Sequence, residues 1–287
     1  MREIERVIAT THVDAHNERI AVEGLESMVE KFSTSYVPFI VEHDPRTPPL
    51  GRVDSAFIRE RPDGEHELVA RIQLFEKGEN PPLPKGARRL TIPSHRSNGL
   101  TIGFDRTFRF DEDQADISEI GRLFRNPAIE EGKKSLDPIS VLKITGIFAL
   151  SSIAAGFFGQ IGADGWNALK DRLANLFTRK ANREKGQLLI LSATIRSDSD
   201  EDFEVQIILT NPTHDDIENA LPVALETVDE VLPVYRNNCP EAGRFVFEVE
   251  NGELELKFVI RNDCLPLFPS LGLNDIRAKI RNRSGGC

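Results

Sequence analysis

An uncharged stretch runs from Ile144 to Ala163 in this chain of 287 residues, whereas charged residues are frequent before and after it. Its length, about 20 residues, is what a helix needs to cross the apolar core of a bilayer. Interspersed glycine, serine and threonine lower its hydropathy, so a buried helix or helical hairpin of a water-soluble protein fits it equally well. The stretch divides the chain into three predicted domains: residues 1–132, 133–185 and 186–287.

Small residues recur at every third or fourth position of this central segment, namely at Ala149, Ser152, Gly156, Gly159 and Ala163. On a helix they form one smooth stripe, which is the kind of surface that lets two helices approach closely. We therefore expect residues 144–163 to be helical and to drive either assembly into a homo-oligomer or membrane association. The sequence leaves both alternatives open, but the basic residues on both sides of the segment argue against a simple single span.

The first 132 residues alternate short apolar runs with turns rich in proline and glycine. Strand-like runs occupy residues 5–13, 36–43, 51–60, 66–75 and 99–110. Residues 22–32 instead have helical spacing, because Leu25, Met28, Val29 and Phe32 fall on one side. Many short strands with one early helix predict a mostly antiparallel β-barrel or β-sandwich.

The last hundred residues predict a small α+β domain. Residues 187–195 and 202–211 read as strands, and residues 215–235 read as a helix that Pro222 interrupts. Residues 244–260 read as a hairpin with Asn-Gly at its turn. The complete chain is therefore expected to belong to the α+β class.

Composition excludes several functional classes. The formal net charge of −10 argues against a nucleic-acid-binding protein. The three cysteines, Cys239, Cys264 and Cys287, are too widely spread for a disulfide framework or a CxxC metal site. The charged N-terminus lacks the apolar core of a signal peptide. We therefore expect a cytoplasmic protein, with membrane association left open, that uses neither a metal nor a cofactor.

Three residues are candidates for catalytic chemistry. His43 follows the apolar run Val-Pro-Phe-Ile-Val and precedes a turn rich in proline, so local structure would hold its imidazole in one orientation, as a general base requires. A histidine that simply ends a strand is the alternative. Thr101 presents a hydroxyl in a short apolar strand between two glycines, and Glu119 is a carboxylate that could orient a histidine.

Five motifs occur in an order that resembles the head maturation (prohead) proteases of tailed phages. They read TTHVDAHNERI, PFIVEHDPRTPPLGRV, LVARIQL, GLTIGF and EIGRLFRNPAI, and together they span somewhat under half of the chain. The resemblance implies a serine-type endopeptidase with a barrel similar to herpesvirus assemblin. It implies that His43 is the base, Thr101 stands at the nucleophile position and Glu119 orients the imidazole. Backbone N–H groups near Gly103 would stabilise the oxyanion.

Two departures from the family pattern leave two functions open. Thr101 replaces the usual serine, and its methyl group crowds the attacking oxygen. A proline-rich stretch, ENPPLPKGARRLTIPSHRSNG, replaces a helix before the nucleophile strand. The chain is predicted to be an endopeptidase with a Ser/Thr-type nucleophile activated by histidine, which processes itself or a partner protein. The alternative is a catalytically inactive binding module whose helical segment drives oligomerisation or membrane association.

Overall fold

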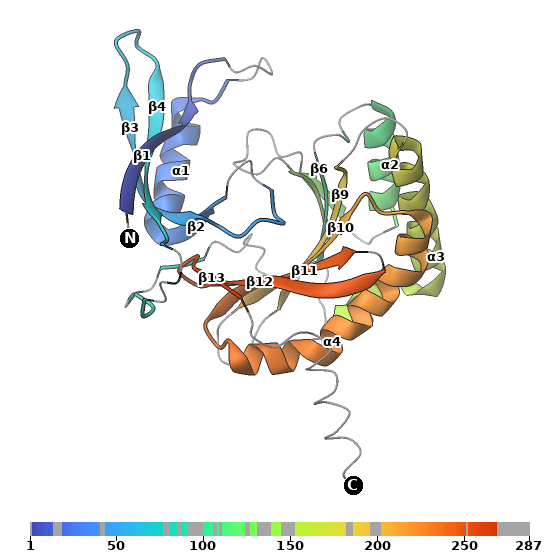
Figure 1. Ribbon diagram of the computed structural model, residues 1–287. Coiled ribbons are helices and arrows are strands. Elements are labelled where there is room, and N and C mark those ends of the chain that lie inside the picture. The colour runs from blue at the N-terminus through green and yellow to red at the C-terminus, as the bar shows by residue number, and fades with distance from the viewer. Residues whose placement is uncertain are drawn as a thin grey trace. The chain divides into compact units, whose positions relative to one another are not determined.

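The computed structural model consists of two compact units. It describes residues 2–13, 19–40, 44–76, 78, 81–84, 86, 88–90, 100–105, 108, 111–123, 127–130, 139–144, 153–181, 186–195, 202–250 and 252–268. The N-terminal unit comprises Met1–Pro93, Lys134–Leu136 and Ile260–Leu267, and the larger unit comprises Ser94–Lys133, Asp137–Val259 and Phe268–Cys287. The α+β class expected from the sequence is confirmed (Figure 1).

The N-terminal unit contains a five-stranded mixed sheet in the order β1-β4-β3-β2-β5. Its strands are β1 (Arg2–Thr10), β2 (Ser35–Phe39), β3 (Gly51–Glu60), β4 (His66–Leu74) and β5 (Arg89–Leu90). The pairs β1–β4, β4–β3 and β3–β2 are antiparallel, whereas β5 runs parallel to β2. In the described residues this sheet does not close into the predicted barrel, because β6, which carries Thr101, pairs with strands of the larger unit instead.

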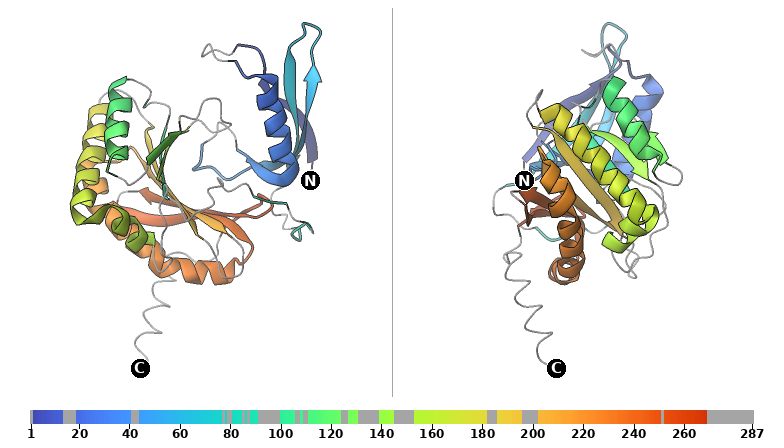
Figure 2. Two further views of the ribbon diagram at one scale, coloured as in Figure 1. Left: turned by 180° about the vertical axis from the view of Figure 1, so that it is seen from behind. Right: turned by 90° about the vertical axis from the view of Figure 1, so that its right-hand side faces the viewer.

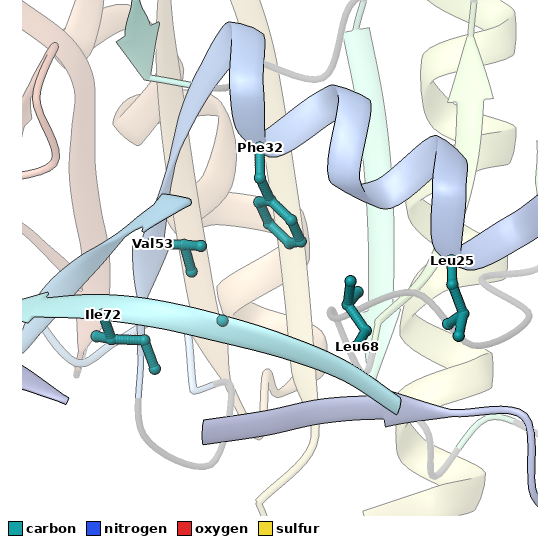
Figure 3. Packing of buried hydrophobic residues seen from close by; sticks show 6 residues of the cluster. Leu25, Phe32, Val53, Leu68 and Ile72 are labelled. Carbon is teal, nitrogen blue, oxygen red and sulfur yellow. The ribbon is translucent and has the colours of Figure 1, made fainter. Parts of the chain in front are cut away.

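Helix α1 (Val22–Thr34) covers one face of this sheet. Leu25 and Phe32, two helical turns apart, are fully buried against Val53, Leu68 and Ile72 of β3 and β4 (Figure 3). Burial of side chains of this size stabilises the fold by about 1.5–3 kcal/mol each. The helix predicted at residues 22–32 is confirmed.

The larger unit is built on an eight-stranded mixed sheet in the order β13-β12-β11-β10-β9-β6-β8-β7. The strands are β6 (Leu100–Asp105), β7 (Pro127–Glu130), β8 (Ile139–Ile144), β9 (Leu188–Ile195), β10 (Phe203–Thr210), β11 (Ala242–Glu250), β12 (Glu253–Arg261) and β13 (Pro266–Leu267). The end of β12 and all of β13 group with the N-terminal unit. No described strand closes this sheet into a barrel.

Helices cover this sheet on one side (Figure 2). They are α2 (Asp111–Gly121), α3 (Ile153–Ala181), a short π-helical segment η2 (Asp216–Ala220) and α4 (Leu221–Asn238). Strands β10 and β11 are parallel, so the chain needs the crossover that η2 and α4 supply. The elements predicted between residues 187 and 260 are observed, and Pro222 is the second residue of α4, directly after the π-helical segment η2.

The central segment differs from its prediction. Ile144 ends strand β8, and helix α3 begins only at Ile153 and continues to Ala181. The run Ile-Ser-Val-Leu-Lys-Ile of β8 contains three β-branched residues and pairs with β6 and β7, which favours a strand. Among the described residues no helix is long and apolar enough to span a membrane.

Two members of the small-residue stripe, Ala149 and Ser152, lie outside the described residues. Gly156, Gly159 and Ala163 lie on the backbone of α3. Self-association through the stripe therefore stays a prediction.

The predicted domain boundaries at residues 132 and 185 do not coincide with the edges of the compact units. Strand β6 from the predicted first domain pairs with β9 from the predicted third, and Thr101 lies opposite Ser192. The strands of two predicted domains thus share one sheet.

Candidate functional site

The three residues at the predicted catalytic positions come from separate parts of the chain. His43 lies outside the described residues. Thr101 is on β6 and Glu119 is on α2, and both elements belong to the larger unit. Convergence of His43, Thr101 and Glu119 therefore stays a prediction.

Strand β6 is an internal strand of its sheet. Thr101 lies opposite Lys143 of β8 on one side and Ser192 of β9 on the other. Gly103 likewise lies between Val141 of β8 and Ile190 of β9. In an antiparallel sheet the N–H and C=O groups of such a strand are used by its two neighbours. The backbone N–H of Gly103 thus belongs to the sheet, which argues against the oxyanion role expected for it.

The Glu119 carboxylate is held by two arginines. One oxygen contacts the guanidinium of Arg122, directly after α2, and the other lies 3.4 Å from Nη2 of Arg172 on α3. In a catalytic triad this carboxylate would accept a hydrogen bond from the imidazole of the base. Here Glu119 instead links α2 to α3.

The residues directly after His43 form a well-defined turn. The Asp44 carboxylate accepts hydrogen bonds from the backbone N–H of Arg46 at 2.9 Å and from its guanidinium Nη2 at 2.6 Å. Thr47 donates its N–H and its hydroxyl to the Asp44 carbonyl at 3.1 and 2.8 Å. The hydrogen bond from the Arg46 side chain holds the pKa of the Asp44 carboxyl below its ordinary value. Short-range polar contacts therefore explain the Asp-Pro-Arg-Thr sequence.

Gly51 ends this connection with a close approach of two strands. A Cβ atom at this position would lie 2.3 Å from the carbonyl oxygen of Gln73 on β4. Leu50 donates its N–H to Phe39 and accepts one from Phe75, each at 2.9 Å. The glycine of the Gly-Arg-Val motif is therefore required by sheet geometry independently of any catalytic role.

Arg52, the next residue, enters a buried polar cluster that the sequence interpretation missed. Its Nη1 lies 3.3 Å from both the carbonyl and the Oδ2 of Asp263, and its Nη2 donates to Gln73 Oε1 at 2.7 Å. Arg261 donates from Nε and Nη2 to the same Asp263 carboxylate, both at 2.7 Å. Arg52, Arg261 and Asp263 are only 6%, 3% and 2% exposed.

Aromatic contacts complete the cluster. The Tyr36 ring lies 4.5 Å from the Arg52 guanidinium and 4.3 Å from that of Arg88, which also donates to the carbonyls of Phe32 and Asp54. Such contacts are favourable cation–π interactions. The only sequence signal was the position of Arg52 in the Leu-Gly-Arg-Val motif, because Asp263 lies 211 residues away.

No group of three or more His, Cys, Asp and Glu side chains within the described part of the chain is arranged to hold a metal ion. No family model matches the chain, and neither a curated protein nor a solved structure matches it.

Proposed function

We propose that this chain is a catalytically inactive, prohead-protease-like binding module for a protein partner. The observation that carries the proposal is the internal position of β6, whose two edges are paired with β8 and β9. An extended substrate has no free edge of β6 to join, and the N–H groups of the strand are already engaged. Threonine at the nucleophile position and the engagement of Glu119 by Arg122 and Arg172 support the same conclusion.

The partner that we propose first is a second copy of the chain, which would make the protein a homo-oligomer. The small residues Gly156, Gly159 and Ala163 recur along the sequence of α3 at a spacing typical of helices that pack closely together. Membrane association through residues 144–163 is the other use of this segment. The finer fold assignment, a protease-like barrel, and a phage-related setting rest on the five motifs, whereas a cytoplasmic location rests on the charged N-terminus and the widely spread cysteines.

An active endopeptidase is the second candidate. The observation that favours it is the ordered turn from Asp44 to Thr47, because a fixed turn directly after His43 would hold an imidazole in one orientation. In this alternative His43 removes the proton from Thr101 and Glu119 stabilises the imidazolium. The chain would then cleave itself or a partner protein.

Incubation of the purified full-length chain, followed by intact mass, separates the two functions. The binding-module proposal predicts an unchanged mass for the wild-type chain and for His43→Ala, and no cleavage of an added unfolded protein substrate. Time-dependent fragments that disappear in both His43→Ala and Thr101→Ala would overturn it in favour of the endopeptidase. Light scattering on Gly156→Leu tests the partner, because a bulky side chain in the stripe should shift an oligomer toward monomer.

A further inference from the structure

A surface pocket of about 480 Å³, lined by both charged and apolar groups, lies in the larger unit, where α3 meets α2. Its lining residues come from one face of α3 and from one carboxylate of α2: Arg172, Asn175, Leu176, Thr178, Arg179 and Asp116. Residues three, four and seven positions apart project from the same side of a helix. Leu176 is 1% exposed and forms an apolar floor. The volume lies in the range of small-molecule sites.

The charged groups at this pocket do not balance. Arg179 is ion-paired with Asp116, but the single carboxylate of Glu119 is shared between Arg122 and Arg172. Among the residues that line the pocket, two guanidiniums, Arg172 and Arg179, face one carboxylate, Asp116, in a chain whose net charge is −10. One anionic group would complete the balance.

The pocket also has spare hydrogen-bond donors. A guanidinium carries five N–H groups, and within the described residues Arg172 and Arg179 each make one ion pair. The Asn175 amide and the Thr178 hydroxyl lie on the same face of α3 and are exposed. Guanidiniums bind carboxylate and phosphate groups through short, charge-assisted hydrogen bonds.

We propose that this pocket binds a small organic oxyanion, independently of the function proposed above. The carboxylate or phosphoryl group of the ligand binds the guanidiniums of Arg172 and Arg179. Asn175 and Thr178 donate to its polar body, and Leu176 contacts its apolar part. Asp116 competes with the ligand for Arg179, so the negative charge of Asp116 limits the affinity.

Isothermal titration of the full-length chain tests this proposal with inorganic phosphate, acetate and the neutral compound glycerol. We expect phosphate, acetate or both to bind with a dissociation constant at or below about 1 mM, and glycerol not to bind. Binding of phosphate alone identifies a phosphoryl ligand, and binding of acetate alone identifies a carboxylate. Absence of binding by both anions at about 10 mM would overturn the proposal.

Variants distinguish a ligand site from a structural ion-pair network. Arg179→Gln should weaken anion binding about tenfold or more, whereas Asp116→Asn should strengthen it by a similar factor because a competing charge is removed. A purely structural role for the pair would not produce opposite effects. Arg71→Gln, which removes an exposed arginine of the N-terminal unit, is the matched control.

Circular dichroism confirms that each variant is folded before titration. If Arg179→Gln is unfolded, Arg172→Gln and Asn175→Ala provide the same comparison from the same face of α3. Equal affinity in Arg179→Gln, Arg172→Gln and Arg71→Gln would show that anions bind elsewhere, and this result would overturn the assignment.

Discussion

Asp263 receives hydrogen bonds from two arginines that lie far apart in the sequence, Arg52 and Arg261, and all three side chains are buried. A buried ion pair adds little to stability relative to a well-packed apolar core, because desolvation opposes the attraction of the charges. Removal of one partner is costly, because it leaves the remaining charge buried and uncompensated. The role of Asp263 is thus to make the burial of Arg52 and Arg261 possible.

We expect Asp263→Asn to lower the free energy of unfolding by about 3 kcal/mol, since both guanidiniums lose their carboxylate. Urea unfolding followed by circular dichroism measures the change. Glu5→Gln is the matched control, because Glu5 forms an exposed pair with Arg71 and its loss should cost under about 1 kcal/mol. Equal effects of the two substitutions would contradict the role of Asp263.

Gly51→Ala should destabilise the N-terminal unit by about 1–3 kcal/mol. The added methyl group would meet the Gln73 carbonyl oxygen at 2.3 Å, and backbone atoms cannot move aside as a side chain could. Gly86→Ala is the control, because nothing lies within 4 Å of the Cβ position there. Thermal unfolding of the two variants provides the comparison, and a shift for Gly86→Ala as large as that for Gly51→Ala would refute the steric argument.

The free energy of unfolding should depend on pH through the Asp44 carboxyl group. Hydrogen bonds from Arg46 lower its pKa in the folded chain below the ordinary value of 3.8. The resulting stabilisation is therefore fully present above pH 3.8 and is lost as the pH falls through the lowered pKa of the folded chain. Asp44→Asn should be less stable than the wild type at neutral pH, and the difference should shrink below pH 3.8. Urea unfolding at several pH values measures it, and a difference independent of pH would contradict the argument.

At the scale of elements, α3 is held to its sheet by aromatic packing. The Phe177 ring lies 4.9 Å from Phe108 and 6.4 Å from Phe104 of β6, and all three side chains are fully buried or nearly so. Such aromatic pairs stabilise the fold by about 0.5–1.5 kcal/mol in addition to the stabilisation from the apolar area that they bury. The part of α3 that follows the segment predicted for membrane association or assembly, residues 144–163, thus packs as an ordinary core helix.

Phe177→Ala should therefore lower the free energy of unfolding by about 3–5 kcal/mol, because it removes the ring that both other phenylalanines contact. Asn167→Ala changes an exposed position of the same helix and should stay within about 0.5 kcal/mol. Denaturant unfolding compares the two. A small effect of Phe177→Ala would mean that α3 does not depend on this aromatic contact.

Local patterns predicted the elements better than they predicted the connections between them. The spacing of Leu25 and Phe32 identified α1, and short apolar runs identified β9 and β10. Hydrophobicity alone could not separate β8 from the helix that follows it, because a short apolar run fits either conformation. The pairing of β6 with β9 was not predictable, since no local signal specifies a partner about 90 residues away. The candidate site was predicted only as three separate residues, and the partners of Glu119 were invisible in the sequence.

At the scale of the whole molecule, the N-terminal unit combines segments from the beginning of the chain and from near its end. Met1–Pro93 forms the sheet and α1, and Ile260–Leu267 brings Asp263 to Arg52. The unit is therefore complete only after most of the chain has been synthesised. The predicted domain of residues 1–132 does not contain Asp263, the carboxylate that pairs with its buried Arg52.

Two truncations test this dependence. A chain ending at residue 268 keeps Asp263, whereas a chain ending at residue 259 loses it together with Arg261. We expect the shorter chain to lose amide-exchange protection in β2, β3 and β4, because Arg52 is left buried without its carboxylate. The chain ending at 268 should retain the protection of the full-length protein.

Asp263→Asn in the full-length chain should reproduce part of the loss in these same strands, since it removes the charge but keeps the segment. Full protection of β3 in the chain ending at 259 would show that the N-terminal sheet and α1 are stable without Asp263. The contact between Arg52 and Asp263 would then not be required for the N-terminal unit to fold.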